Sequence, residues 1–389
     1  MHSYAHGLVF SFTLLVPFAC SSGSDSPSAA GGAGAAASQA GSAATAGASG
    51  STTASAGASA SGAGAGGTSS GVAGASAGSA GSAGASAGAS GSAGAGGGTT
   101  GPAARGEYLV KNVLGCPGCH TPQLAGGGGP DMTKFLSGVE CFAKDPTTMG
   151  CLNSANLTND DTGLKKKTDQ QIKDAFTKGL DPDAPTPGSQ YLFAQMPYYQ
   201  FANLSDDDAN AIVAYLRTVP PVVHASENGA PFDKQPTAAQ WTPVVPANLP
   251  APVNAAPADA ASAANGKYLA TLACSTCHTA NTSATSPLQL DASKGFQGGK
   301  EFTTSVMVNN VPTSKKIQSA NLTPDATGLK DWTLAQIATA IKTDKDDKSV
   351  ALCSPMRGLP NITDQDAMDI AVYLKAIPPV ANARTEMCQ

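Results

Sequence analysis

The clearest pattern in the chain is a pair of amphipathic segments that end in the same way. Apolar residues recur every three or four positions before Pro220-Pro221 and again before Pro378-Pro379, which is the spacing of one helix face. Because proline cannot continue a helix, each pair of prolines is expected to end the helix before it. The predicted faces are Ile212, Tyr215, Leu216 and Val219, and Ile370, Tyr373, Leu374 and Ile377.

Helix starts recur as well. Thr168 is followed three residues later by Gln171, and Thr333 by Gln336, which is the arrangement of a capping box at a helix N-terminus. Similar starts with Asp in place of Gln run from Ser205 to Asp208 and from Thr363 to Asp366. Alternating strand patterns are scarce. The sequence therefore predicts an all-α fold built from short helices.

Short motifs between the helices also recur in the same order. The pairs are Gly106-Glu107-Tyr108-Leu109 with Gly266-Lys267-Tyr268-Leu269, Ser154 to Thr158 with Ser319 to Thr323, and Thr162-Gly163-Leu164 with Thr327-Gly328-Leu329. Such self-similarity indicates a duplicated unit. We predict two homologous domains in tandem: the first repeat at residues 105–222, and the second repeat at 263–380, whose domain runs on to residue 389.

The N-terminal part predicts an exported protein on a tether. Within residues 1–20, the apolar run Gly7–Ala19 is too short to span a bilayer and suits the core of a signal peptide. Cys20 resembles the lipid-bearing cysteine of a bacterial lipoprotein; the alternative is a plain secretory signal cleaved near Ala19. Residues 21–104 are almost entirely Gly, Ala, Ser and Thr, so we expect a disordered Gly/Ala/Ser linker. Its 84 residues would reach roughly 50 Å.

A proline-rich segment, residues 223–262, joins the two repeats and is expected to act as a semi-rigid strap. Phe232 and Trp241 are its candidate anchors. They either pin the strap across both domains or cover local apolar surface.

Charge and cysteine content narrow the functional classes. The net charge of −5 and the pI of about 5.5 give no indication of a nucleic-acid partner. Nine cysteines fit an oxidising compartment outside the cytoplasm. The simplest pairing joins Cys141 to Cys151 and Cys353 to Cys388, although the sequence does not determine the connectivity.

The chemistry-bearing motif is Cys-x-x-Cys-His, which occurs once in each repeat. It reads Cys116-Pro117-Gly118-Cys119-His120 in the first repeat and Cys274-Ser275-Thr276-Cys277-His278 in the second. This spacing is the attachment signature of c-type haem, in which both thiols form thioethers and the histidine binds the iron. Zinc sites and thioredoxin-like dithiols also use Cys-x-x-Cys, but they do not account for a histidine directly after both pairs. We predict two covalently bound haem c groups.

The second axial ligand of each iron is predicted to be methionine. The chain has five histidines, which are too few for two histidines at each iron once the N-terminal pair is set aside. Met196 and Met356 stand at equivalent places, each on a loop ahead of the final helix of its repeat. A thioether ligand favours ferrous iron and raises the reduction potential. His120 and His278 are the predicted partners of Met196 and Met356.

With these motifs the chain resembles tandem class I cytochromes c, in particular the cytochrome c subunits of membrane-bound alcohol and aldehyde dehydrogenases. The resemblance rests on the haem motifs, the Asn-Leu-Thr segments, the methionine loops and the Tyr-Leu…Pro-Pro endings. It implies that Asn156 and Asn321 lie close to the haems, as does Trp332, where the first repeat has Lys167. The family usually has proline before the ligand methionine, as at Pro355.

The resemblance implies an electron carrier in the periplasm or cell envelope, exported and held to a membrane through a lipidated Cys20. Expected partners are a dehydrogenase as donor and an oxidase or another cytochrome as acceptor. The family normally carries three haem domains, so other oxidoreductases remain candidate partners. A dihaem peroxidase is the alternative, and a haem-based sensor or adhesive protein is a third. The sequence leaves open the direction of electron flow and which haem has the higher potential.

Overall fold

The computed structural model describes residues 101–385 apart from 126–127, 146, 283–288 and 309–310. The expected signal peptide, Cys20, the linker and Cys388 lie outside these residues. Contacts divide the chain into two units, and all described residues belong to the unit formed by 1–24 and 93–389. The other unit, 25–92, lies outside the described part.

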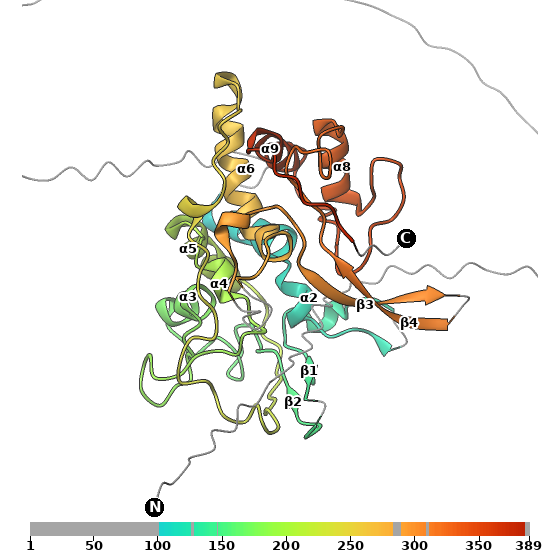
Figure 1. Cartoon of the computed structure of the whole chain (residues 1–389). Helices are drawn as coiled ribbons and strands as arrows, with labels where there is room; N and C mark the ends of the chain where they lie inside the picture. Colours follow the sequence, from blue (N-terminus) through green and yellow to red (C-terminus); the bar gives the residue numbers. More distant parts are fainter. Residues whose placement is uncertain (1–100, 126–127, 146, 283–288, 309–310, 386–389) are drawn as a thin grey trace, which may run out of the picture. The chain divides into compact units, whose positions relative to one another are not determined.

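Short helices make up most of the described elements, as Figure 1 shows. The first repeat contains α1 (Pro102–Tyr108), the π-helix η1 (Leu109–Val113), α2 (Cys116–His120), α3 (Asp169–Lys178), α4 (Tyr198–Phe201) and α5 (Asp206–Leu216). The second contains α6 (Ala260–Ala273), α7 (Ser275–His278), α8 (Leu334–Thr343) and α9 (Asp364–Ala376). Short 3-10 helices are η3 (Met132–Lys134), η4 (Pro246–Asn248), η5 (Pro257–Asp259) and η6 (Ala292–Lys294).

The predicted helix ends are confirmed. Thr168 and Thr333 each accept a hydrogen bond from the backbone of the residue three positions on, and Gln171 and Gln336 complete both capping boxes. Helices α5 and α9 end at Leu216 and Ala376, ahead of the double prolines. The local sequence therefore specifies the same start and stop signals in both repeats.

The expectation of a purely helical fold is wrong in one region. Strands β3 (Glu301–Val308) and β4 (Val311–Gln318) form an antiparallel pair, in which Glu301 pairs with Gln318. Among the described residues of the corresponding stretch of the first repeat, the only strands are the two-residue β1 (Ala143–Lys144) and β2 (Cys151–Leu152). Valine and threonine are frequent in residues 301–318, and β-branched side chains favour strands. The fold is mostly α rather than all α.

One of the two simplest disulfide pairings is confirmed. Cys141 bonds to Cys151 beside the short strands of the first repeat. Cys353 is also disulfide-bonded, while Cys388 lies outside the described residues.

The first and last helices of each repeat cross at a glycine. A Cβ atom at Gly106 of α1 would lie 1.9 Å from the backbone oxygen of Ala211 in α5. At Gly266 of α6 it would lie 1.9 Å from the backbone oxygen of Asp369 in α9. Only glycine allows the two backbones to approach this closely. Each crossing fixes the helical segment that precedes a Cys-x-x-Cys-His motif; in the first repeat η1 lies between α1 and the motif turn.

The two repeats contact each other through equivalent residues. Tyr108 of the first repeat donates its hydroxyl hydrogen to Asp366 of the second. Tyr268 of the second repeat, the counterpart of Tyr108, donates to Asp208 of the first at 2.7 Å. Both carboxylates are buried, with Asp208 5% and Asp366 6% exposed. We call these four residues the tyrosine–aspartate clamp.

The two carboxylates of the clamp differ in their remaining partners. Arg105 makes a two-pronged ion pair with Asp208, with both N–O distances 2.8 Å. The corresponding partner of Asp366 is Asn265, which donates at 3.1 Å. Asp366 therefore depends more on its tyrosine than Asp208 does, since Asn265 is a neutral donor.

We expect Tyr108→Phe to lower the free energy of unfolding more than Tyr268→Phe does. Each change removes a hydrogen bond to a buried carboxylate, which costs about 1–3 kcal/mol, and the loss at Asp366 is not offset by a direct ion pair. Urea unfolding of both variants measures the difference. Tyr191→Phe, at a partly exposed tyrosine outside the clamp, serves as the control. Equal losses in both clamp variants would contradict the prediction.

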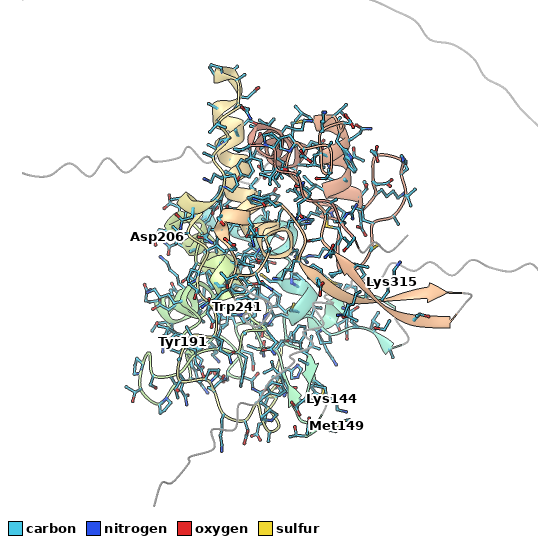
Figure 2. All side chains as sticks on the ribbon, in the orientation of Figure 1. Lys144, Met149, Tyr191, Asp206, Trp241 and Lys315 are labelled. Atoms are coloured by element: carbon cyan, nitrogen blue, oxygen red, sulfur yellow. A yellow bond between two sulfur atoms is a disulfide. The ribbon has the colours of Figure 1, made fainter. Side chains whose placement is uncertain are left out.

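The strap contacts both repeats. Trp241, labelled in Figure 2, is buried, stacks on Tyr199 with ring centroids 3.8 Å apart and donates from Nε1 to the carbonyl of Ala194 at 2.7 Å. Phe232 packs edge-on against Phe193. Further along the strap, the carbonyl of Pro250 accepts a hydrogen bond from Tyr373 of the second repeat at 2.9 Å. The ring contacts of Phe232 and Trp241 are with the first repeat, which fits the interpretation that they cover local apolar surface. The contact of the strap with the second repeat is made near Pro250 instead.

Candidate functional site

Each Cys-x-x-Cys-His motif forms a single helical turn. The turns are α2 and α7, and each follows the helix that crosses the last helix of its repeat. The thiols of Cys116, Cys274 and Cys277 are free and partly buried. Burial raises the pKa of the Cys116 and Cys274 thiols to about 12. These thiols are therefore neutral, and they lie beside the apolar core.

Cys119, the fourth cysteine of the motifs, is disulfide-bonded in this structure. Its sulfur can form a thioether only after that bond is reduced. The other three cysteines need no such step.

The two motif histidines are held in the same orientation. Nδ1 of His120 donates to the carbonyl of Ala155 at 2.8 Å, and Nδ1 of His278 donates to the carbonyl of Ala320 at 2.9 Å. Both side chains are buried, and burial lowers the pKa of each imidazole. A neutral imidazole that donates from Nδ1 leaves the lone pair of Nε2 available for a metal. Each imidazole can therefore bind a metal through Nε2.

The asparagines named by the sequence brace the loops that orient these histidines. Asn156 follows Ala155, and its side chain donates to the carbonyl of Val222 at 2.8 Å. Asn321 follows Ala320 and donates to the carbonyl of Val380 at 2.7 Å. The side-chain oxygens of both asparagines accept a backbone hydrogen bond from the threonine two residues on. Both asparagine side chains bond to other parts of the protein. They therefore affect each histidine indirectly, by holding in place the alanine carbonyl that accepts its hydrogen bond.

The loops that carry Met196 and Met356 contain the same backbone turn in both repeats. The backbone N–H of Met196 donates to Phe193 at 3.0 Å, and that of Met356 donates to Cys353 at 2.8 Å. Met196 is partly buried and packs against the same apolar core as Cys116. Met356 is also partly buried. The equivalence of the two loops, which the sequence predicted, is present in their backbone hydrogen bonds.

The repeats differ at the tryptophan position. Trp332 is partly buried and packs against the apolar core. Lys167, at the same place in the first repeat, instead makes an ion pair with Asp183. The first repeat therefore has a charged pair at the position where the second has an aromatic ring.

Residues of each repeat contact the motif region of the other, which the sequence does not predict. Arg357, next to Met356, donates from Nη2 to the carbonyl of Leu114 at 3.4 Å, two residues before Cys116. Gln200 of α4 accepts a hydrogen bond at 2.6 Å from Thr276 inside the second motif. Local sequence carries no signal for such contacts, because the partners are far apart in the chain.

These surroundings fit a covalently bound haem at each motif. Each motif turn carries at least one free cysteine beside an apolar core. Each adjoining histidine is buried as the tautomer that leaves Nε2 unprotonated, and each repeat has a methionine loop ahead of its last helix. Within the described residues, no group of three or more His, Cys, Asp and Glu side chains is arranged to hold a metal ion. Nor does this part of the chain contain a helix with both the length and the apolar character needed to cross a bilayer.

Comparison with known proteins agrees with this description. Residues 103–220 match the cytochrome c family. The chain is 28% identical to the cytochrome c subunit of alcohol dehydrogenase (quinone) from Gluconobacter oxydans (strain 621H), over 72% of this chain and 55% of that protein. The subunit of the same name from Komagataeibacter europaeus is also 28% identical, over 71% of this chain and 56% of its own length.

A second group of relatives matches over a shorter stretch. The fructose dehydrogenase cytochrome subunit of Gluconobacter japonicus is 29% identical over 33% of this chain and 24% of its own length. The chain spans about half the length of the alcohol dehydrogenase subunits it matches.

Proposed function

We propose that this cytochrome c, which resembles the cytochrome c subunits of quinone alcohol dehydrogenases, is a dihaem electron carrier with one haem in each of two tandem domains. The observation that supports this most directly is the recurrence of one histidine geometry, in which His120 and His278 each donate from Nδ1 to an alanine carbonyl. The family match covers residues 103–220. The equivalent contacts at 263–380 extend the proposal to the second repeat.

Each site would be held by residues in matching roles. Cys116 and Cys119 would form the thioethers of the first site, and Cys274 and Cys277 those of the second. His120 with Met196, and His278 with Met356, would be the axial ligands. A bound haem supplies one-electron redox chemistry, and the chain sets its potential and its access to solvent. Asn156, Asn321 and Trp332 would shape the surroundings of the two sites.

The partners in this proposal are redox proteins. A dehydrogenase would donate electrons, because the relatives are named as cytochrome subunits of dehydrogenases, and an oxidase or another cytochrome would accept them. The protein would be exported through residues 1–20, tethered by the linker 21–104 and held to a membrane through a lipidated Cys20. The comparisons give no support to the dihaem peroxidase alternative.

Haem content tests the proposal. The matured protein is expected to carry two haems per chain, measured by mass and by the pyridine haemochrome spectrum, and its reduced spectrum is expected to stay unchanged with carbon monoxide. Replacing both Cys274 and Cys277 by Ser should leave one haem, because thioether attachment needs the thiols.

The control for this test is the pair Cys141→Ser and Cys151→Ser. It removes the disulfide between Cys141 and Cys151 and should lower stability, by about 3 kcal/mol or less for so short a loop, without changing the haem count. One haem in the unaltered protein, or a carbon monoxide shift in half of its haem, would contradict a carrier with two six-coordinate sites.

A further inference from the structure

A lysine, Lys300, contacts the backbone of the second motif, and the position equivalent to it in the first repeat holds no charged side chain. Lys300 donates from Nζ to the carbonyl of Thr276 at 2.9 Å, and Thr276 stands between Cys274 and Cys277. Thr276 is buried, so the ammonium group approaches the motif beneath the surface. Burial lowers the pKa of the Lys300 ammonium, and the hydrogen bond to Thr276 offsets part of the cost of burying this charge.

Backbone hydrogen bonds identify the residue that replaces Lys300 in the first repeat. The N–H of Lys300 donates to Oγ of Ser319 at 3.1 Å, and the N–H of Ser319 donates back to the carbonyl of Lys300. In the first repeat Val139 exchanges the same two bonds with Ser154, with distances of 2.8 and 3.0 Å. A cation at the second site therefore corresponds to an apolar side chain at the first.

A second cation, Arg357, lies beside the first motif, where its Nη2 donates to the carbonyl of Leu114 at 3.4 Å. Variants of Lys300 that leave Arg357 unchanged therefore isolate the effect of the lysine on the second site.

A fixed positive charge favours the reduced state of a nearby redox centre, because reduction adds a negative charge that the cation stabilises. The Coulomb energy of such a pair grows as the surroundings become less polar. A lysine held against the backbone of the motif is therefore placed where its charge acts strongly on that site.

We propose that Lys300 raises the reduction potential of the second site above that of the first, so that electrons entering at the first repeat pass to the second. This inference rests on the proposed function, because it requires a haem at each motif. In this proposal Lys300 acts through its positive charge and does not bind either haem directly.

The test is a spectroelectrochemical titration of the holoprotein after its two haems have been counted. Lys300→Gln keeps a donor for the Thr276 carbonyl and removes the charge, and Lys300→Val installs the residue of the first repeat. The higher of the two potentials should fall by at least the equivalent of a tenfold change in the reduction equilibrium, about 59 mV for one electron, while the lower one stays unchanged. Lys300→Arg keeps the positive charge, so the higher potential should stay close to that of the unaltered protein.

Two further variants make the test specific. Val139→Lys should raise the lower potential, because it gives the first site the charge of the second. Lys375→Gln is the matched control: the ammonium of Lys375 also binds loop carbonyls, those of Leu329 and Lys330, and both potentials should stay unchanged.

The possible failures are distinguishable. A protein with a single haem would overturn the proposed function. Two haems whose higher potential does not move in Lys300→Gln, or whose lower potential falls instead, would overturn the role of Lys300 alone.

Discussion

Replacing Met196 or Met356 by Ala is expected to lower the reduction potential of one haem by on the order of 0.1–0.3 V, within the range of about 0.8 V that axial ligands span. Thioether sulfur stabilises ferrous iron, and its loss leaves either water or an open position at the iron. Each single variant should also gain carbon monoxide binding in half of its haem. Redox titration and the reduced visible spectrum measure both effects.

Met368→Ala is the control for this pair. Met368 lies on α9 and packs, partly buried, against the same core, so its loss should reduce stability without changing either potential. If Met196→Ala or Met356→Ala leaves the potentials and the carbon monoxide response unchanged, the ligand at that iron is another residue. The equivalent turns at Met196 and Met356 would then serve only to close the loops.

Gly106→Ala is expected to lower the free energy of unfolding by about 3 kcal/mol or more, at the upper end of the range for overpacking. The added Cβ atom would lie 1.9 Å from the backbone oxygen of Ala211. Relief requires α1 and α5 to separate, and α1 leads into the turn that carries Cys116. The same change at Gly266 should have a similar effect in the second repeat. Urea unfolding measures both.

Gly188→Ala is the matched control for the helix crossing. Gly188 has a positive φ of 78°, and a Cβ atom there would meet nothing within 4 Å. This substitution should cost only the backbone strain, about 1 kcal/mol. A loss at Gly106 no larger than at Gly188 would show that the crossing tolerates a wider spacing than the structure indicates.

Local features of the fold could be predicted because they depend on residues close together in the sequence. Both capping boxes at Thr168 and Thr333 and the helix ends before the double prolines are of this kind. The pairing of β3 with β4 could not be predicted from alternation, which is weak in this region; the valine and threonine content is the feature that favours strands there. Comparison with the first repeat does not predict this pairing either, because the described residues of the corresponding stretch there form only two-residue strands.

The residues of the candidate sites could be predicted where they belong to short sequence motifs. The cysteines, the histidines and the methionine loops could all be found in that way. The hydrogen bond from His120 to the carbonyl of Ala155 could not be predicted, because it depends on how two loops pack. Lys300 and Val139 could not be matched by counting, because Lys300 stands three residues further from His278 than Val139 stands from His120. Only their equivalent backbone hydrogen bonds identify them as counterparts.

The tyrosine–aspartate clamp bears on how such a chain can arise. Tyr108 and Asp208 belong to the same repeat, and each bonds to the counterpart of the other in the second repeat. An interface in which residue i meets j while j meets i is isologous, which is the geometry of a two-fold homodimer. A polypeptide with a single repeat would carry both halves of this contact on one surface. Joining two copies by a strap would then convert an association between molecules into one within a chain, whose strength no longer depends on protein concentration.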